Sequence, residues 1–227
     1  MVTETPSFEI LTPISDGGIE ELQLIEKVGR TCYKSEDKIT PDGESAKKFV
    51  KNLINAGHEA MIEHGPSLSV KFIVDRAVAN EMVRHRVASF AQESTRYCNY
   101  SKDKFGNEIT AITPYGGILL DKGMQGVDSD ALGAICYEWE NAMNEAEKHY
   151  MRMIELGATP QIARSVLPCS LKTEIVMTAN YREWRHFFKL RTAPSAHPQI
   201  RWTAIPLLRE LQKRLPIIFD DIVVEEE

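Results

Sequence analysis

The longest regular pattern in the sequence is a run of apolar side chains that recurs every three or four positions between residues 132 and 153. This spacing is typical of a long amphipathic helix, and Gly157 gives it an end. The side chains on the apolar face are Leu132, Ile135, Trp139, Met143, Ala146, Tyr150 and Met153. We expect them to serve the core or contacts between subunits rather than to hold a cofactor.

Further segments show the same helical period and carry recognisable ends. They are residues 22–32, 45–56, the stretch from Asp75 onward, a short helix started by Thr159-Pro160, a helix opened by Asn180, and residues 198–215 with a kink at Pro206. Asn180 followed by Glu183 is a helix N-cap with an acid at the third position. In that helix Trp184, Phe187 and Phe188 are expected to face inward.

Three segments alternate or run as strands do: residues 8–11, residues 68–72 and residues 171–179. They are not joined in regular βαβ units. The predicted fold class is therefore α+β, mainly helical with a small and largely antiparallel sheet, in a single domain over residues 1–227. The Gly-, Asp- and Asn-rich stretch from Tyr100 to Gly126 is predicted to be a long loop.

Composition and charge narrow the class of protein. The chain has 43% hydrophobic and 26% charged residues, which is typical of a folded globular protein. Its net charge of −6 argues against nucleic acid or a membrane surface as partner, and no apolar run approaches the roughly 18 residues of a membrane span. The segment from Met1 lacks a secretion signal, and the four cysteines are widely spaced. We therefore expect a reduced, cytoplasmic protein with free thiols.

Two local clusters of basic residues stand out against the acidic whole. Between Asn180 and Arg201 there are five basic residues and one acid, and between Arg84 and Lys104 there are five basic residues and two acids. Either cluster alone could be a solvated face. Because His and aromatic residues are interleaved with both, a pocket for phosphorylated aromatic ligands is the alternative interpretation. The basic residues of the first cluster are Arg182, Arg185, Lys189, Arg191 and Arg201.

The most specific segment runs from Arg84 to Tyr97. It opens with Arg-His-Arg at 84–86 and reaches Ser94 after seven further residues. This pattern resembles the signature of the flavin-dependent (alternative) thymidylate synthases. We expect Arg84 and His85 on the exposed face of the preceding helix, and Ser94 and Arg96 on one face of an extended segment.

The resemblance extends over most of the chain through further elements in the family's order. They are Gly57-His58-Glu59 with Glu63-His64, Arg164-Ser165-Val166-Leu167-Pro168, Asn180-Tyr181-Arg182 with Leu190-Arg191, and His197-Pro198-Gln199. The resemblance implies conversion of dUMP to dTMP, with 5,10-methylenetetrahydrofolate as carbon donor and FAD reduced by NADPH. It also implies a homotetramer with active sites shared between subunits and no cysteine nucleophile. We expect no metal, because the spacing of the histidines does not match a zinc site.

Site residues follow from the resemblance position by position. The residues implied to bind FAD are His58, Ala60, Arg84, His85, Arg86, Gln92, Asn180, Tyr181, Arg182 and His186. Those implied to bind dUMP are Glu81, Arg84, Gln92, Glu93, Ser94, Thr95, Arg96, Arg164 and Arg191. Arg96 and Arg164 would hold the phosphate. Arg191 would be the catalytic cation beside the uracil ring.

Four positions depart from the family's commoner pattern. Glu81 stands where Gln is frequent, Ala60 where a small hydroxyl residue is common, Ala91 where Asn or Ser is found, and His186 where Asn is frequent. None of these differences removes a charged residue from the signature.

Other interpretations predict different behaviour. A nucleotide- or RNA-binding module without catalysis would be colourless, whereas another flavin oxidoreductase would be yellow and indifferent to dUMP. His58 and His64 could suggest a metal site, but zinc pairs on helices usually lie four residues apart. Ser94 with His85 could suggest nucleophilic catalysis, but no Gly-x-Ser-x-Gly element surrounds Ser94.

Overall fold

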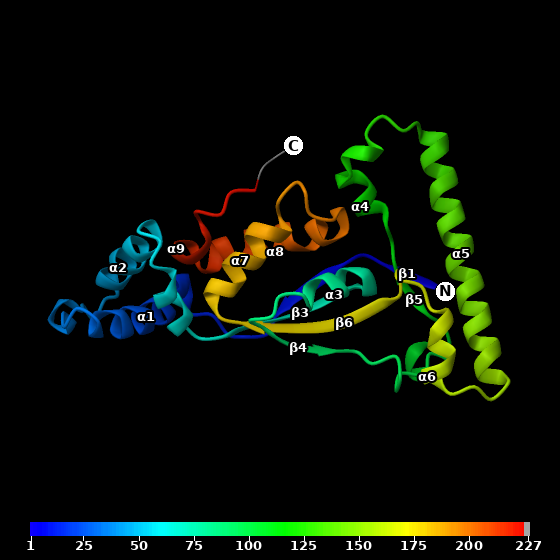
Figure 1. Ribbon diagram of the computed structural model, residues 1–227, viewed down its shortest axis with the longest axis horizontal. Coiled ribbons are helices and arrows are strands. Elements are labelled where there is room, and N and C mark those ends of the chain that lie inside the picture. Colours follow the sequence, from blue (N-terminus) through cyan, green and yellow to red (C-terminus); the bar gives the residue numbers. More distant parts are fainter. Residues whose placement is uncertain (225–227) are drawn as a thin grey trace. The chain divides into compact units, whose positions relative to one another are not determined.

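The computed structural model describes residues 1–224 and confirms the α+β class (Figure 1). The chain divides into two compact units. Unit 1 consists of residues 1–7, 72–84 and 91–176, and unit 2 consists of residues 8–71, 85–90 and the described residues from 177 onward. The expectation of a single domain stays a prediction.

A four-stranded sheet has the order β2-β3-β6-β4. Its strands are β2 (Ser7–Ile10), β3 (Leu68–Asp75), β6 (Lys172–Ala179) and β4 (Ser89–Gln92). Strands β3 and β6 are antiparallel, because the hydroxyls of Ser69 and Thr178 meet at 2.8 Å while the Arg76 N–H donates to the Leu171 carbonyl. Two short strands, β1 (Val2–Glu4) and β5 (Thr110–Ile112), pair in parallel. The largely antiparallel sheet is thus confirmed.

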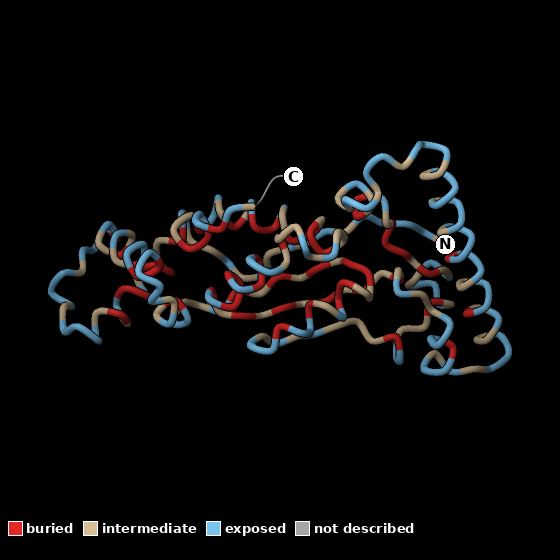
Figure 2. Tube along the Cα trace, turned by 45° about the horizontal axis from the view of Figure 1, so that its top comes forward, coloured by how far each residue is buried: buried red, intermediate tan, exposed pale blue. Residues whose placement is uncertain are grey.

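Unit 1 contains the predicted long helix, α5 (Ser129–Glu155), capped by the Asp128 carboxylate. It lies beside the β1–β5 pair in Figure 1, and the Glu147 carboxylate accepts a hydrogen bond from the Ile109 N–H at 2.9 Å. Met143 and Tyr150 are the only buried residues of α5, and Figure 2 draws most of the helix as exposed. The other helices of unit 1 are α3 (Arg76–Met82), α4 (Tyr115–Leu120) and α6 (Pro160–Ala163).

Unit 2 is mainly helical. Its helices are α1 (Ile19–Thr31), α2 (Glu44–Asn55), α7 (Tyr181–Arg191), α8 (Pro198–Arg214) and α9 (Pro216–Phe219), with a 3-10 helix, η3, at Glu59–His64. Helix α7 begins as predicted, because Asn180 Oδ1 accepts from the Glu183 N–H at 2.9 Å. Its three aromatic residues Trp184, Phe187 and Phe188 are buried, which confirms the inward face.

Gly65 allows α7 to lie close to the end of η3. A Cβ at this position would come within 2.7 Å of the Tyr181 ring, far inside van der Waals contact. The Tyr181 side chain fills this space in the core, where it is 1% exposed and lies edge-on to Phe219. The absence of a side chain at Gly65 thus helps to fix both walls of the pocket described below.

Two predicted segments were wrong. The apolar spacing of Ala79, Met82, Val83 and Val87 predicts a helix from Asp75 through Val87, but the helix ends at Met82, because the chain turns at residues 83–88 to enter β4. Residues 100–126 are not a plain loop. Thr110–Ile112 pair with β1, and α4 follows with Gly116 and Gly117 buried, so tertiary contacts order a segment whose composition is typical of loops.

The four cysteines are free thiols, as predicted. Within residues 1–224, no helix combines the length and the apolar character needed to cross a membrane.

Candidate active site

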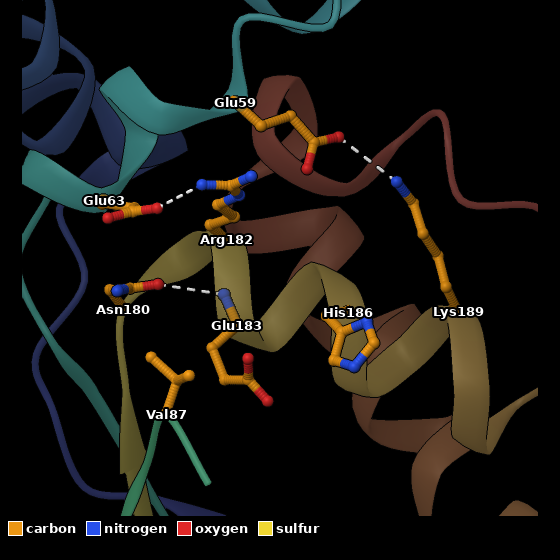
Figure 3. Close-up of a pocket in the computed structure, with 8 residues that line it drawn as sticks. All are labelled: Glu59, Glu63, Val87, Asn180, Arg182, Glu183, His186 and Lys189. Carbon is orange, nitrogen blue, oxygen red and sulfur yellow. Dashed lines mark hydrogen bonds and ion pairs between the residues drawn. The ribbon is translucent and has the colours of Figure 1, made fainter. Parts of the chain in front are cut away.

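Unit 2 contains a pocket of about 360 Å³ between η3 and α7, within the size range of small-molecule sites (Figure 3). Its lining residues are Glu59, Glu63, Val87, Asn180, Arg182, Glu183, His186 and Lys189. Five of these come from α7 or its N-cap, because residues three and four positions apart share one face of a helix. The wall opposite α7 is η3, which belongs to the Gly-His-Glu…Glu-His element.

Ion pairs join the two walls of this pocket. Arg182 Nη1 contacts the Glu63 carboxylate at 2.5 Å, and Lys189 Nζ lies 3.2 Å from Glu59 Oε1. Figure 3 shows both pairs on the same side of α7. Burial raises the pKa of Glu59, but hydrogen bonds from Arg185 and Lys189 outweigh it and hold that pKa below its usual range. The pocket therefore presents fixed charges of both signs.

His85, which follows α3, is the centre of a second group of contacts, and it makes them with residues of α7. Its ring is 4% exposed, with Nδ1 2.9 Å from Glu183 Oε1 and Nε2 3.1 Å from Arg191 Nε. The rings of His186 and Phe187 lie against it at centroid distances of 5.6 and 5.1 Å. Two motifs that are 98 residues apart in sequence thus meet within unit 2.

Burial is the main cause that lowers the pKa of His85, and the positive charge of Arg191 adds to it. The Glu183 carboxylate acts in the opposite direction without reversing the shift. The imidazole is consequently neutral at pH 7. The prediction that His85 lies on an exposed helix face was wrong, because α3 has already ended and the ring is buried against α7. Arg84 is exposed, but in the turn after α3 rather than on it.

His85, Glu183 and His186 also place possible metal-ligand atoms within 4.8 Å of one another. Both ring nitrogens of His85 are already hydrogen-bonded, and the Arg191 guanidinium brings positive charge to Nε2. A metal ion would have to displace that cation. The absence of a metal cofactor remains a prediction.

In unit 1, several of the residues implied to bind the nucleotide lie close to one another. Arg164 Nη1 donates to Thr95 Oγ1 at 3.3 Å, and Tyr100 Oη donates to Glu93 Oε1 at 2.9 Å. Burial first, and then the Glu93 carboxylate, raise the pKa of Tyr100 well above its usual range. The phenol therefore stays protonated and remains a donor to Glu93.

The segment after β4 differs from its prediction. Residues 95–97 form a turn, in which the N–H groups of Tyr97 and Cys98 donate to the Ser94 carbonyl. The prediction of an extended segment was wrong, since Ser94 Oγ lies 3.4 Å from the Arg96 N–H and the side chains cannot alternate across a strand. The exposed Arg96 guanidinium stacks 5.5 Å from the Tyr97 ring.

The remaining predicted residues have varied surroundings. His58, Ala60 and Arg86 are exposed and Gln92 and Glu81 are half-buried. Gln92 Nε2 donates to Thr173 Oγ1 at 3.3 Å. Because the Tyr181 side chain is in the core, a ligand contact at this position would come from its main chain.

Arg185 belongs to the predicted basic cluster but has a structural role. It is 1% exposed and donates to Glu59 at 3.0 Å, to Asp221 at 2.6 Å and to the Ile218 carbonyl. The partner Asp221 belongs to the acidic end of the chain, whose residues Asp220, Asp221, Glu225, Glu226 and Glu227 are in sequence typical of a solvated, frayed end. Asp220 and Asp221 are exposed as expected, although Asp221 also pairs with the buried Arg185, while residues 225–227 lie outside the described part.

The residues that the resemblance implies as ligand contacts do not include five that line this pocket, although Lys189 stood in the basic cluster and two others in a quoted motif: Glu59, Glu63, Val87, Glu183 and Lys189. A signal was available for Lys189, because Arg182, His186 and Lys189 follow the helical spacing of i, i+4 and i+7. Glu183 was interpreted only as the partner of the N-cap. Its second role, through the side chain, depends on a residue distant in sequence.

Comparison with known proteins shows the family. The model of the thymidylate synthase complementing protein family matches residues 19–217. A flavin-dependent thymidylate synthase of Mycobacterium sp. strain KMS is 32% identical over 212 residues, covering 88% of this chain and 80% of the relative. A flavin-dependent thymidylate synthase from Corynebacterium aurimucosum is 29% identical over 212 residues, and the match covers 92% of this chain and 82% of the relative.

A solved structure gives the same fold. The UMP/dUMP methylase PolB from Streptomyces cacaoi, bound with 5-Br dUMP, superposes with a TM-score of 0.79. It is 23% identical and the match covers 97% of this chain and 96% of that one. The chain thus shares its fold with PolB. It belongs to the thymidylate synthase complementing protein family, that of the flavin-dependent thymidylate synthases.

Proposed function

We propose that this protein is a flavin-dependent thymidylate synthase that methylates dUMP to dTMP, with 5,10-methylenetetrahydrofolate as carbon donor and FAD reduced by NADPH. One observation carries the proposal beyond family membership. His85 of the Arg-His-Arg signature contacts Glu183 and Arg191 of the Asn-x-Arg…Leu-Arg helix directly. Two of the family's motifs therefore form one chemical environment.

The pocket between η3 and α7 fits the polar edge of a flavin. Asn180, Arg182 and His186 are implied to contact FAD, and all three line this pocket together with the apolar Val87. Side chains of this kind supply donors and acceptors for ring nitrogens, carbonyls and phosphates. FAD, when bound, would supply the redox chemistry of the reaction.

The nucleotide is proposed to bind to the Arg96–Arg164 region of unit 1. Thr95 holds Arg164 by a hydrogen bond, and Arg96 is exposed in the adjoining turn. Guanidinium groups pair bidentately with phosphate, which suits the 5′-phosphate of dUMP.

Arg191 is proposed to activate the substrate. Uracil C5 becomes nucleophilic as electron density moves from N3 and O4 into the ring, and a fixed cation beside those atoms favours that form. Arg191 cannot be the general base, because a guanidinium stays protonated at any physiological pH. Its role is electrostatic, so the orientation of the Arg191 guanidinium relative to the uracil ring matters.

The homotetramer with shared active sites is part of the proposal. Helix α5 supports it, since this long helix buries only two of its residues fully and exposes Ile135 and Tyr137. The spread of implied ligand contacts over several distant segments is a further support. Free thiols are compatible with the proposed cytoplasmic location.

An absorption spectrum of the purified protein tests the proposal against its rivals. A yellow protein whose flavin spectrum shifts on addition of dUMP is expected. A colourless protein would favour a nucleotide-binding module, and a yellow protein indifferent to dUMP would favour another flavin oxidoreductase. The same titration with UMP shows whether the chain discriminates at the 2′ position of the sugar.

A further inference from the structure

We propose that Glu183 is a positioning residue that fixes the tautomer and orientation of His85, and that His85 in turn directs the guanidinium of Arg191. This inference rests on the proposed function, because it concerns how the cation that activates uracil is held. We refer to the two hydrogen bonds that join Glu183, His85 and Arg191 as the His85 network.

The chemistry of the donors decides where the proton of His85 lies. Arg191 Nε can only donate, so His85 Nε2, at 3.1 Å, must accept. A neutral imidazole carries one N–H, which is therefore on Nδ1 and points to Glu183 Oε1 at 2.9 Å. The carboxylate thus selects the only neutral tautomer that can accept from Arg191.

Because Glu183 and His85 are buried, removing the Glu183 carboxylate would leave the N–H at His85 Nδ1 without an acceptor. Glu183 is 8% and His85 4% exposed, so water cannot readily replace either partner. Without an acceptor at Nδ1, the imidazole is free to carry its proton on Nε2 instead. A donor would then face the donor of Arg191, and the guanidinium would have to turn away.

The position of Glu183 in the helix separates this role from a structural one. The hydrogen bond that caps α7 runs from the Glu183 backbone N–H to Asn180 Oδ1, so it survives a change of the side chain. The His85 ring also keeps its packing against Phe187. A side-chain variant at 183 should therefore fold with α7 intact.

Two variants separate hydrogen bonding from charge. Glu183→Gln keeps a carbonyl oxygen that can accept from Nδ1, but removes the negative charge. Glu183→Ala removes both. The matched control is Glu210→Gln, which breaks an ion pair with Arg214 on α8, outside the proposed site.

The first readout does not depend on activity. Long-range ¹H–¹⁵N spectra of histidine-labelled protein report the imidazole tautomer, and loss of a signal in His85→Gln assigns it. At about pH 7 we expect neutral His85 with the proton on Nδ1 in the wild type, in Glu183→Gln and in Glu210→Gln. Glu183→Ala should move the proton to Nε2 or give a mixture. A wild-type proton on Nε2, or no change in Glu183→Ala, would overturn the proposal.

The second readout separates catalysis from binding. In Glu183→Ala, kcat for dTMP formation should fall about ten- to a hundredfold, with a smaller change in the KM for dUMP. Glu183→Gln should stay within a few-fold. Among the described residues, the charged or titratable groups that act most strongly on His85 are Glu183, Arg191 and His186, all of α7. Loss of the Glu183 charge should therefore move the acid limb of the Glu183→Gln pH profile to lower pH.

The outcomes distinguish this inference from the function on which it rests. If the wild type forms no dTMP, the proposed function fails, while the spectra still test the His85 network. If the wild type is active and Glu183→Ala keeps its kcat, Glu183 has no positioning role. If Glu183→Ala does not fold, the pKa of His85 in Glu183→Gln is compared with that in the wild type. An unchanged pKa of His85 would contradict its contact with the Glu183 carboxylate.

Discussion

Arg191 donates from Nε to Nε2 of His85 over 3.1 Å, although the two residues are 106 positions apart. The Arg-His-Arg signature and the last turn of α7 are thereby joined through a single hydrogen bond. This contact ties the orientation of one implied site residue to the protonation of another. It also explains why an arginine, with a donor at Nε, is suited to this position.

Replacing Arg191 by lysine tests that relationship. Arg191→Lys keeps the charge but removes the Nε donor and the planar fork. It should fold, retain flavin and lose dTMP formation by orders of magnitude, while flavin reduction by NADPH falls much less. Arg214→Lys, an exposed pair with Glu210, is the control. Equal losses in both rates would make Arg191 a general scaffold residue.

Arg164→Ala should weaken dUMP binding without loss of flavin. A charge-assisted contact with phosphate contributes roughly 1.5–3 kcal/mol, so Kd should rise about ten- to a hundredfold. The matched control is Arg152→Ala, which removes an exposed arginine paired with Glu155 in the same unit. Titration of the flavin spectrum with dUMP gives both constants, and normal binding by Arg164→Ala would remove this residue from the nucleotide site.

Arg84→Ala should lose its flavin during purification. Arg84 lies exposed in the turn between α3 and β4, next to His85. Its guanidinium is therefore available to a phosphate of FAD. The ratio of flavin to protein absorbance measures the effect. A fully loaded Arg84→Ala protein would contradict the assignment.

The four cysteines should be dispensable for the chemistry. Cys32 and Cys169 are exposed, and burial raises the pKa of the half-buried Cys98 thiol, which disfavours the reactive thiolate. Single Ser replacements of these residues and of Cys136 should leave dTMP formation within a few-fold. Abolished turnover in one folded, flavin-bound variant would restore a cysteine-nucleophile mechanism.

Asp221→Asn should destabilise the fold in a pH-dependent way. Hydrogen bonds from Arg185 hold the pKa of Asp221 below its usual range. The contribution of this pair to stability is therefore present above about pH 4 and is lost as pH falls through the lowered pKa.

Denaturant unfolding at several pH values measures that effect. At pH 7 the free energy of unfolding should fall by about 1–2 kcal/mol, because Glu59 and the Ile218 carbonyl still hold Arg185. The difference from wild type should narrow below about pH 4. In the control, Glu210→Gln, the change should stay within about 0.5 kcal/mol. A pH-independent difference would show that the ion pair is not its cause.

Local patterns predicted most of the fold. The periods of α1, α2 and α5, the Asn180 cap of α7 and the alternation in β3 all appear where residue spacing placed them. The failures arose where distant contacts decide the structure. The strand β5 exists because β1 pairs with it, and α3 stops at Met82 although Val87 continues its apolar spacing.

The candidate site shows the same division. The motifs named Asn180, Arg182 and His186, which do line a pocket. They could not reveal that Arg185 is buried against Asp221, or that Glu183 meets His85, because those contacts join segments far apart in sequence. Charge in a sequence window does not distinguish a cation that faces a ligand from one that is paired in the core.

Product formation is the decisive test of the proposed thymidylate synthase activity. Purified protein with FAD is mixed with dUMP, 5,10-methylenetetrahydrofolate and NADPH, and dTMP is measured against reactions that lack one component each. We predict dTMP only in the complete reaction, with a methyl carbon that derives from labelled folate. No dTMP from a folded, flavin-loaded protein that binds dUMP, or dTMP formed equally well without flavin, would contradict it.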